Sequence, residues 1–236
     1  MIPQLNVEGR TEHKRRMNEL LQFDVASTAV LTIDMQNDYL DMTCGTALVD
    51  PEEAKRVIYH AGLLLDFARA HQLPVIHVYV QRRPEEAERY VAKANIVTTR
   101  GSRDQLETTG GRDRSKANRV VGTPQAEIPV SLVAPGDLHV TGKRVMDGFF
   151  GTELNELLAE VFKVKTVVIT GVNTDTCVYA TTFGASIRNF QPIVISDCVA
   201  SNRGTDQHWM ALELMARSIS WVMTVDEFKE KLTTSL

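Results

Sequence analysis

The sequence predicts an α/β domain built on a parallel sheet. The runs TAVLTI at 28–33 and TVVIT at 166–170 are apolar and β-branched without polar alternation, which is typical of strands buried on both faces. Segments with apolar residues at helical spacing lie between such runs, as after Pro51. The length of 236 residues suits one large domain of this kind and is short for two.

The elements follow one another from an N-terminal arm at residues 1–27, which is polar and carries the charge run HKRRMNE. We expect this arm to lie over the domain or a neighbouring subunit, or to be a solvated tail. The main domain then spans 28–236. Its expected elements are a strand at 28–33, a helix opening at Asp50 and Pro51, strands at 75–80 and 138–140, a helix near Thr152, a strand from Thr166, a helix from Thr174 or Asp175, a strand at 192–196, a helix at 206–216, a strand at 219–224 and a helix at 226–232.

Residues 81–135 form a long, charged and weakly periodic insertion in this domain. Its first part, RRPEEAERYVAKAN, has helical character, and the rest resembles a loop. An irregular insertion of this length is usually functional or mobile, so we interpret it as a lid or rim over the site. Its arginines are expected on a solvated surface.

Charge and cysteine content exclude several classes of protein. A net charge of -4 without a basic cluster argues against binding to nucleic acid or to an anionic membrane. The three cysteines form neither a CxxC pair nor a zinc-binding spacing, and an odd number is a poor disulfide framework. The N-terminus has no signal-peptide pattern and no apolar run is long enough to span a bilayer, so we expect a cytoplasmic protein.

A nicotinamide cofactor is not expected. The sequence DMQND follows the first strand, where a dinucleotide-binding turn would need glycines to let a pyrophosphate approach the backbone. We predict no cofactor.

Three side chains with complementary chemistry come near the carboxyl ends of different predicted strands: Asp34, Lys143 and Cys177. Cys177 would lie in the first turn of a helix, where unpaired N–H groups favour a thiolate. An aspartate can accept the thiol proton and a lysine can stabilise the resulting charge. Each residue alone has a common alternative: a helix cap, a surface charge and a packed core thiol. His77, in the middle of a strand, is interpreted as a core residue.

Three segments resemble the isochorismatase-like cysteine hydrolases, the superfamily that includes nicotinamidases and N-carbamoylsarcosine, biuret, ureidoacrylate and maleamate amidohydrolases. These segments are AVLTIDMQNDYL at 29–40, KRVMDGFFGTEL at 143–154, and VVITGVNTDTCVYATTFGASIRNF at 167–190, which continues into VISDCVAS at 194–201. Their order and spacing agree with the family over most of 28–228. The arm and the 81–135 insertion carry little of the resemblance.

The resemblance implies a Rossmann-like three-layer α/β/α fold with a six-stranded parallel sheet and an Asp34, Lys143, Cys177 catalytic triad. It also implies a cis peptide between Val172 and Asn173, with the N–H groups of Asn173 and Cys177 forming an oxyanion hole. The family members are commonly dimers or tetramers, so a homo-oligomer is expected. Candidate substrate-binding residues are Gln36, Asn37, Phe149, Phe150, Thr174 and Arg203.

Departures from subfamily patterns narrow the expected activity. Nicotinamidases carry an Asp-x-His pair and a further His for a metal, which HVYVQRRPEEAERY lacks, so we predict no metal. The presence of Cys177 favours an amidohydrolase that cleaves a small amide or carbamoyl C–N bond. If Arg203 faces the site, the substrate would carry a carboxylate, as N-carbamoyl amino acids do; otherwise a neutral ureide such as biuret fits equally. The alternatives are an isochorismatase-type vinyl ether hydrolase and a non-catalytic binding protein.

Overall fold

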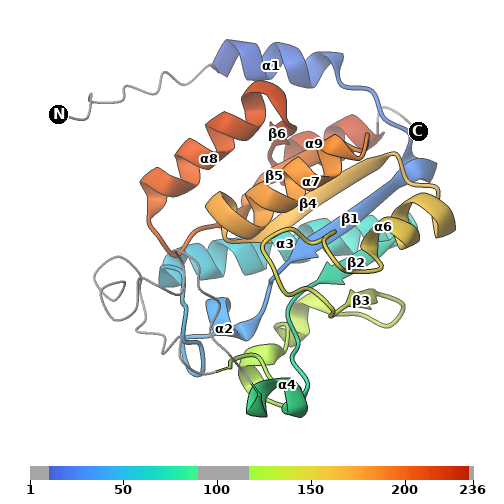
Figure 1. Cartoon of the computed structure of the whole chain (residues 1–236). Helices are drawn as coiled ribbons and strands as arrows, with labels where there is room; N and C mark the ends of the chain where they lie inside the picture. Colours follow the sequence, from blue (N-terminus) through green and yellow to red (C-terminus); the bar gives the residue numbers. More distant parts are fainter. Residues whose placement is uncertain (1–10, 90–116, 234–236) are drawn as a thin grey trace.

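A computed structural model describes residues 11–89 and 117–233, and its centre is a six-stranded sheet (Figure 1). All strand pairs are parallel, and the strand order is β3-β2-β1-β4-β5-β6. The strands are β1 (Thr28–Ile33), β2 (Val75–Val78), β3 (Leu138–Val140), β4 (Thr166–Val172), β5 (Gln191–Ala200) and β6 (Trp221–Met223).

Two strands differ in length from the sequence prediction. The expected strand at 75–80 ends as β2 at Val78, and Val80 instead forms an isolated antiparallel bridge with Gly142. The expected strand at 192–196 continues as β5 to Ala200. Its register against β4 shifts between the pairs Ile169–Val194 and Gly171–Val199, so an irregularity absorbs residues 195–198 of β5 and pairing resumes beyond them.

Helices cover both faces of the sheet, which confirms the three-layer α/β/α architecture. Apolar residues of α3 (Pro51–Ala70) and α9 (Val225–Thr233) share one core with Val30 of β1. Apolar residues of α7 (Tyr179–Ile187) and α8 (Thr205–Ser218) share the opposite core with Leu31, as does the short α6 (Leu154–Glu156) with its π-helical continuation η5 (Leu157–Val161). Alternating strand residues therefore enter opposite cores, as expected for a sheet buried on both sides.

The described part of the N-terminal arm lies on the chain's own domain. Helix α1 (Thr11–Leu20) runs beside α8 and β6 in Figure 1, and a short 3-10 turn, η1 (Val25–Ser27), leads into β1. The Trp221 indole donates to the Met17 carbonyl across 3.1 Å, and Asn18 donates to the Val222 carbonyl across 3.1 Å. The arm thereby covers the edge strand β6.

The described ends of the 81–135 insertion pack beside the carboxyl end of β1. They contain α4 (Pro84–Glu88), η3 (Pro124–Ala126) and η4 (Val130–Leu132), whereas residues 90–116 and the remainder of the expected helix lie outside the described residues. The short helix α2 (Asn37–Leu40) follows β1, and its Asn37 N–H donates to the Glu127 carbonyl across 2.8 Å. This part of the insertion therefore borders the edge where the candidate residues lie.

The strand order also fixes where a ligand would bind. The chain winds outward from β1 toward β3 and from β4 toward β6, so its direction reverses between the neighbours β1 and β4. Ligands of open parallel sheets bind at such a switch point, beyond the carboxyl ends of the strands. Asp34 follows β1 and Cys177 follows β4, so the two residues flank it.

Candidate active site

Asp34 leaves β1 with an unusual backbone conformation. Its φ is 50°, in the left-handed region, which few non-glycine residues adopt. Its N–H still donates to the Val78 carbonyl of β2 across 2.9 Å, and its own carbonyl accepts from Gln36 N–H across 2.7 Å. The turn holds the fully buried Asp34 carboxylate at the end of the sheet.

Lys143 reaches this carboxylate from the opposite side of β2. It follows β3 by three residues, in a segment tied to Val80 through Gly142. Its ammonium is enclosed by protein and donates to Asp34 Oδ2 across 2.6 Å and to Cys177 Sγ across 3.5 Å. The structure thus brings together the three predicted residues, which are far apart in the sequence.

Cys177 is presented by the turn that follows β4. The peptide between Val172 and Asn173 is cis, as the resemblance implied. The helix then starts at Thr174 as a π-helical turn, η6 (Thr174–Val178), and continues as α7. Single π-helical turns are rare and frequently lie at functional sites. The predicted helix start is confirmed, although the first turn is wider than an α-helical one.

The surroundings of Cys177 favour the protonated thiol. Burial raises its pKa to about 11; the Lys143 charge opposes this increase and the Asp34 charge adds to it. Burial therefore acts against the thiolate that the helix start is expected to favour, and it is the largest of these effects. Burial alone would lower the pKa of Lys143, but Asp34 and Cys177 raise it, so Lys143 stays charged. A nucleophilic Cys177 needs a base, and Asp34 is placed to act as one.

The turn before Cys177 is tied to the segment after β5. Asn173 Oδ1 accepts from Asn202 N–H across 3.0 Å, and the Asn173 carbonyl accepts from Thr176 and Val178 N–H. These bonds fix the Asn173 backbone at the carboxyl end of β4, where the direction of winding reverses. The predicted oxyanion-hole residues, Asn173 and Cys177, therefore belong to one rigid turn.

A family model of the isochorismatase domain matches residues 28–227. The chain belongs to the isochorismatase family. This membership confirms the resemblance seen in the sequence and the expectation of a hydrolase.

Isochorismatase-family relatives include two named amidohydrolases. Ureidoacrylate amidohydrolase RutB of Pseudomonas syringae is 26% identical over 223 residues, which cover 89% of this chain and 85% of the relative. Maleamate amidohydrolase of Pseudomonas putida is 28% identical over 183 residues, or 76% and 75% of the two chains. The crystal structure of a cysteine hydrolase from Pseudomonas syringae pv. phaseolicola matches with a TM-score of 0.70 and 22% identity, over 92% of this chain and 97% of that chain. This last similarity confirms the fold.

Two candidate substrate-binding residues of this isochorismatase-family chain follow Asp34 closely, and their side chains form hydrogen bonds with the backbone of the insertion or its flank. Gln36 is buried, and its amide nitrogen donates to the carbonyls of Val80 and Ala126 across 2.8 and 2.7 Å. Asn37 is partly exposed and donates from Nδ2 to the Pro124 carbonyl across 3.1 Å. Their described contacts therefore shape the rim of the site.

The candidates Phe149, Phe150 and Thr174 differ in their burial and in their contacts. Phe149 is a core residue, stacked on Phe190 with ring centroids 5.8 Å apart, and Phe150 is 67% exposed. The turn after Lys143 directs the Phe149 ring into the core cluster that also contains Cys177 and leaves Phe150 exposed, and a role for either ring in binding substrate stays a prediction. Thr174, in contrast, is buried in the catalytic turn, and its hydroxyl lies 2.8 Å from His208 Nδ1.

Arg203 lies near the catalytic turn but is already paired. Its Nη1 lies 3.1 Å from Asp175 Oδ2 and 3.5 Å from the Thr176 hydroxyl. Asp175 also accepts from the Ser201 hydroxyl, so this ion pair fastens the segment after β5 to the catalytic turn. If Arg203 binds a substrate carboxylate, it must do so while paired with Asp175 or after leaving Asp175.

Two residues near the site were missed by the sequence reasoning: His208 and Arg119. His208 opens α8 and is buried against Thr174, and burial lowers its pKa to about 4. Arg119 comes from the insertion and is buried against Asp38 and Tyr39. Arg119 lies in an aperiodic segment that carries no local signal of burial. His208 lies in the expected helix at 206–216, at helical spacing with the buried Ala211, Leu212 and Met215, so the helical period could have indicated its burial.

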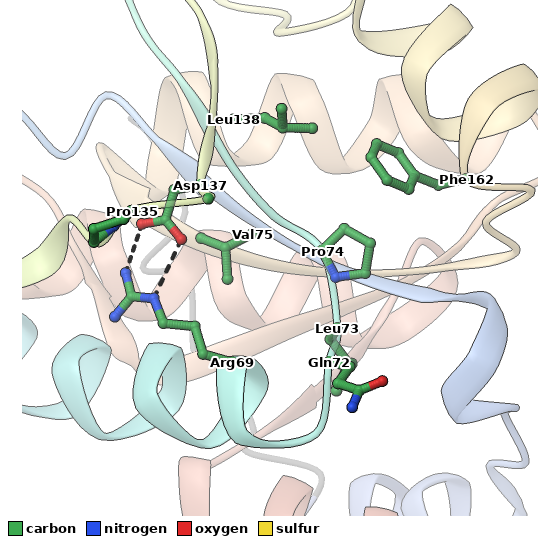
Figure 2. A pocket seen from close by; sticks show the side chains of 10 residues that line it. Arg69, Gln72, Leu73, Pro74, Val75, Pro135, Asp137, Leu138 and Phe162 are labelled. Atoms are coloured by element: carbon green, nitrogen blue, oxygen red, sulfur yellow. Dashed lines mark hydrogen bonds and ion pairs between the residues drawn. The ribbon is translucent and has the colours of Figure 1, made fainter.

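A hollow of about 380 Å³ lies at the opposite edge of the sheet. Figure 2 shows it between the end of α3 and the starts of β2 and β3, with Arg69 paired to Asp137 at its side. It is far from the triad along the strands, because it adjoins their amino ends.

Within residues 11–89 and 117–233, no three His, Cys, Asp or Glu side chains gather as metal ligands, and no helix is long and apolar enough to cross a membrane.

Proposed function

We propose that this protein is a cysteine-dependent amidohydrolase that cleaves a small amide or carbamoyl C–N bond through a thioester. The observation that carries the proposal is the position of the Lys143 ammonium, 2.6 Å from Asp34 Oδ2 and 3.5 Å from Cys177 Sγ in a buried site. A base, a nucleophile and a fixed positive charge therefore meet at the switch point of the sheet. That combination suits nucleophilic attack on a carbonyl carbon.

The first half of the proposed reaction is acylation of Cys177. Asp34 takes the thiol proton as sulfur forms a bond to the substrate carbonyl carbon, and the carbonyl oxygen becomes an oxyanion. The backbone N–H groups of Asn173 and Cys177 would stabilise that oxyanion. Asp34 then returns the proton to the leaving nitrogen as the C–N bond breaks, which releases ammonia or an amine and leaves a thioester.

The second half is hydrolysis of the thioester. Asp34 takes a proton from a water molecule, whose oxygen attacks the thioester carbon, and the proton returns to sulfur as the C–S bond breaks. Lys143 stays charged throughout and balances the negative charge that alternates between Asp34, the sulfur and the oxyanion. Each cycle consumes one water molecule and regenerates the thiol.

Substrates in the proposed class are small amides and ureides, either N-carbamoyl amino acids or related compounds such as biuret. Two relatives are named as hydrolases of ureidoacrylate and of maleamate, which supports an amide or ureide as the reacting group. Their identities of 26% and 28% support the reaction class.

We also propose that the protein works as a homo-oligomer. Apolar side chains that remain exposed on η5 and α8, among them Val161, Trp209 and Leu214, favour burial against a second copy. Light scattering coupled to gel filtration tests this independently of activity. A monomer at micromolar concentration would contradict it.

Ammonia release from a panel of substrates tests the proposed reaction. The panel contains N-carbamoylsarcosine, N-carbamoylglycine, biuret, ureidoacrylate, maleamate and nicotinamide, each with wild type, Cys177→Ser and the control Cys44→Ser, which removes a thiol outside the triad. We expect turnover of at least one ureide or amide that Cys177→Ser abolishes and Cys44→Ser retains. Isochorismate is assayed beside the panel, and release of pyruvate from it without ammonia from any amide would instead identify a vinyl ether hydrolase.

A further inference from the structure

We propose that Arg119 binds a carboxylate of the substrate, which makes that substrate an amido or ureido acid. This inference rests on the proposed function and names the residue that would set its substrate class. It concerns a buried cation brought to the site by the 81–135 insertion.

Arg119 is held rigidly by two neighbours from α2. Its Nε donates to Asp38 Oδ2 across 2.8 Å, and its Nη2 donates to the Tyr39 hydroxyl across 2.7 Å. The guanidinium also stacks on the Tyr39 ring, with its carbon 4.5 Å from the ring centroid. Only 6% of the residue is exposed, and its backbone carbonyl is fixed by Arg82 N–H across 2.8 Å.

These contacts place Arg119 beside the triad. Asp38 and Tyr39 lie in the turn of helix that follows Asp34, so their partner shares the carboxyl edge of β1. The charges agree with this position: Arg119 lowers the pKa of Cys177, and Asp34 helps to raise the pKa of Arg119 against the effect of burial. The Tyr39 oxygen likewise helps to raise the pKa of Lys143.

Arg119 keeps unused hydrogen-bonding capacity on this edge. Its Nε and Nη2 are engaged, and its Nη1 has no hydrogen-bond partner among residues 11–89 and 117–233. The Tyr39 hydroxyl accepts from Arg119, so its own proton can be donated elsewhere. A guanidinium N–H and a phenolic O–H side by side offer two donors to the two oxygens of one carboxylate.

Asp38 is itself held in place by several hydrogen bonds, so we expect it to stay paired with Arg119 when substrate binds. Its Oδ1 accepts from the Thr46 N–H and hydroxyl across 3.0 and 2.6 Å, and its Oδ2 also accepts from Asn118. The guanidinium is therefore oriented before the substrate arrives, which lowers the entropic cost of binding. Arg203 is paired with Asp175 through Nη1 and is the alternative carboxylate-binding residue that the experiment must separate from Arg119.

Comparing matched substrates in arginine variants tests the proposal. Wild type, Arg119→Gln, Arg119→Lys and Arg203→Gln are assayed with N-carbamoylglycine, which carries a carboxylate, and with biuret, a neutral ureide of similar size. We expect Arg119→Gln to raise KM for N-carbamoylglycine about 10- to 100-fold and to lower the preference for it over biuret by a similar factor, because a charge-assisted hydrogen bond is lost. Arg119→Lys should recover part of the preference, and Arg203→Gln should change it less than about threefold.

Two outcomes would overturn the proposal. An equal loss of kcat for both substrates in Arg119→Gln would assign Arg119 to the electrostatics of the triad, and a preference lost in Arg203→Gln instead would assign the carboxylate to Arg203. Thermal unfolding of each variant shows whether the fold is retained.

A binding measurement separates this inference from the proposed reaction. Malonate is titrated calorimetrically into Cys177→Ala protein with Arg119 intact and with Arg119→Gln added. Binding that only the second variant loses supports a carboxylate site even if no substrate in the panel is turned over. Equal malonate affinity in the two variants contradicts the site even if the protein proves to be an amidohydrolase.

Discussion

Lys143 donates a hydrogen bond to Asp34 Oδ2 across 2.6 Å, and both side chains are withdrawn from solvent. The two residues follow β3 and β1, which are separated in the sheet by β2, so the lysine side chain must extend over the end of an intervening strand. A buried ion pair of this kind is weak evidence for stability, because desolvation offsets much of the attraction. Its position beside Cys177 instead suggests a catalytic reason for burying two charges.

Lys143→Met should impair both activity and stability. We expect kcat/KM to fall at least about 1,000-fold and the free energy of unfolding to fall by about 3–5 kcal/mol, because the buried Asp34 carboxylate loses its counter-charge. Urea denaturation measures the second effect. The double variant Lys143→Met/Asp34→Asn should recover stability but not activity, and a single variant as stable as wild type would contradict the uncompensated-charge argument.

Asp34→Asn should change thiol reactivity and hydrolysis in opposite directions. The Asp34 charge contributes to the raised pKa of Cys177, about 11, whereas burial is the larger cause and Lys143 opposes both. Removing the carboxylate should lower that pKa, so alkylation by iodoacetamide at pH 8 should accelerate about threefold for each unit of decrease, because the thiolate fraction rises about tenfold while the nucleophilicity of the thiolate falls. Amide hydrolysis should nevertheless be lost, because no base remains. Slower alkylation of Cys177, with Cys44 as internal reference, would contradict this assignment.

His208 should make the folded protein less stable in mild acid. Burial, and then the Arg56 charge, lower its pKa from 6.5 to about 4. Between those two values the unfolded chain binds a proton at this histidine and the folded chain does not, so the free energy of unfolding decreases as the pH falls, by up to about 3 kcal/mol. His208→Gln should show a shallower decrease over the same range in chemical denaturation. Identical slopes in the two proteins would show that His208 titrates normally.

Gly171→Ala should be severely destabilising. Gly171 has a φ of 126°, and a Cβ at this position would collide with the Ile33 carbonyl oxygen on the adjacent strand β1. We expect a loss of more than about 3 kcal/mol or failure to fold. Gly62→Ala is the matched control, because Gly62 lies within α3 with no atom within 4 Å of the new Cβ, and it should be neutral or stabilising by about 0.5–1 kcal/mol. Comparable stability of the two variants would exclude the proposed steric cause.

The sequence by itself determined the strands, most helices and three residues of the proposed triad. Buried strands have a local pattern, and their carboxyl ends converge in any parallel sheet, so Asp34, Lys143 and Cys177 could be placed together before their distances were known. The raised pKa of Cys177 could not be predicted in this way, because it depends on how completely other segments bury the sulfur.

Only the tertiary structure decided which other side chains complete the site. Arg119 reaches it because an aperiodic insertion packs on α2, and His208 reaches it because α8 docks on the catalytic turn. Phe149 and Phe150 are adjacent in the sequence but face the core and the solvent. Such choices depend on contacts between segments distant in the chain, which neither periodicity nor local propensity encodes.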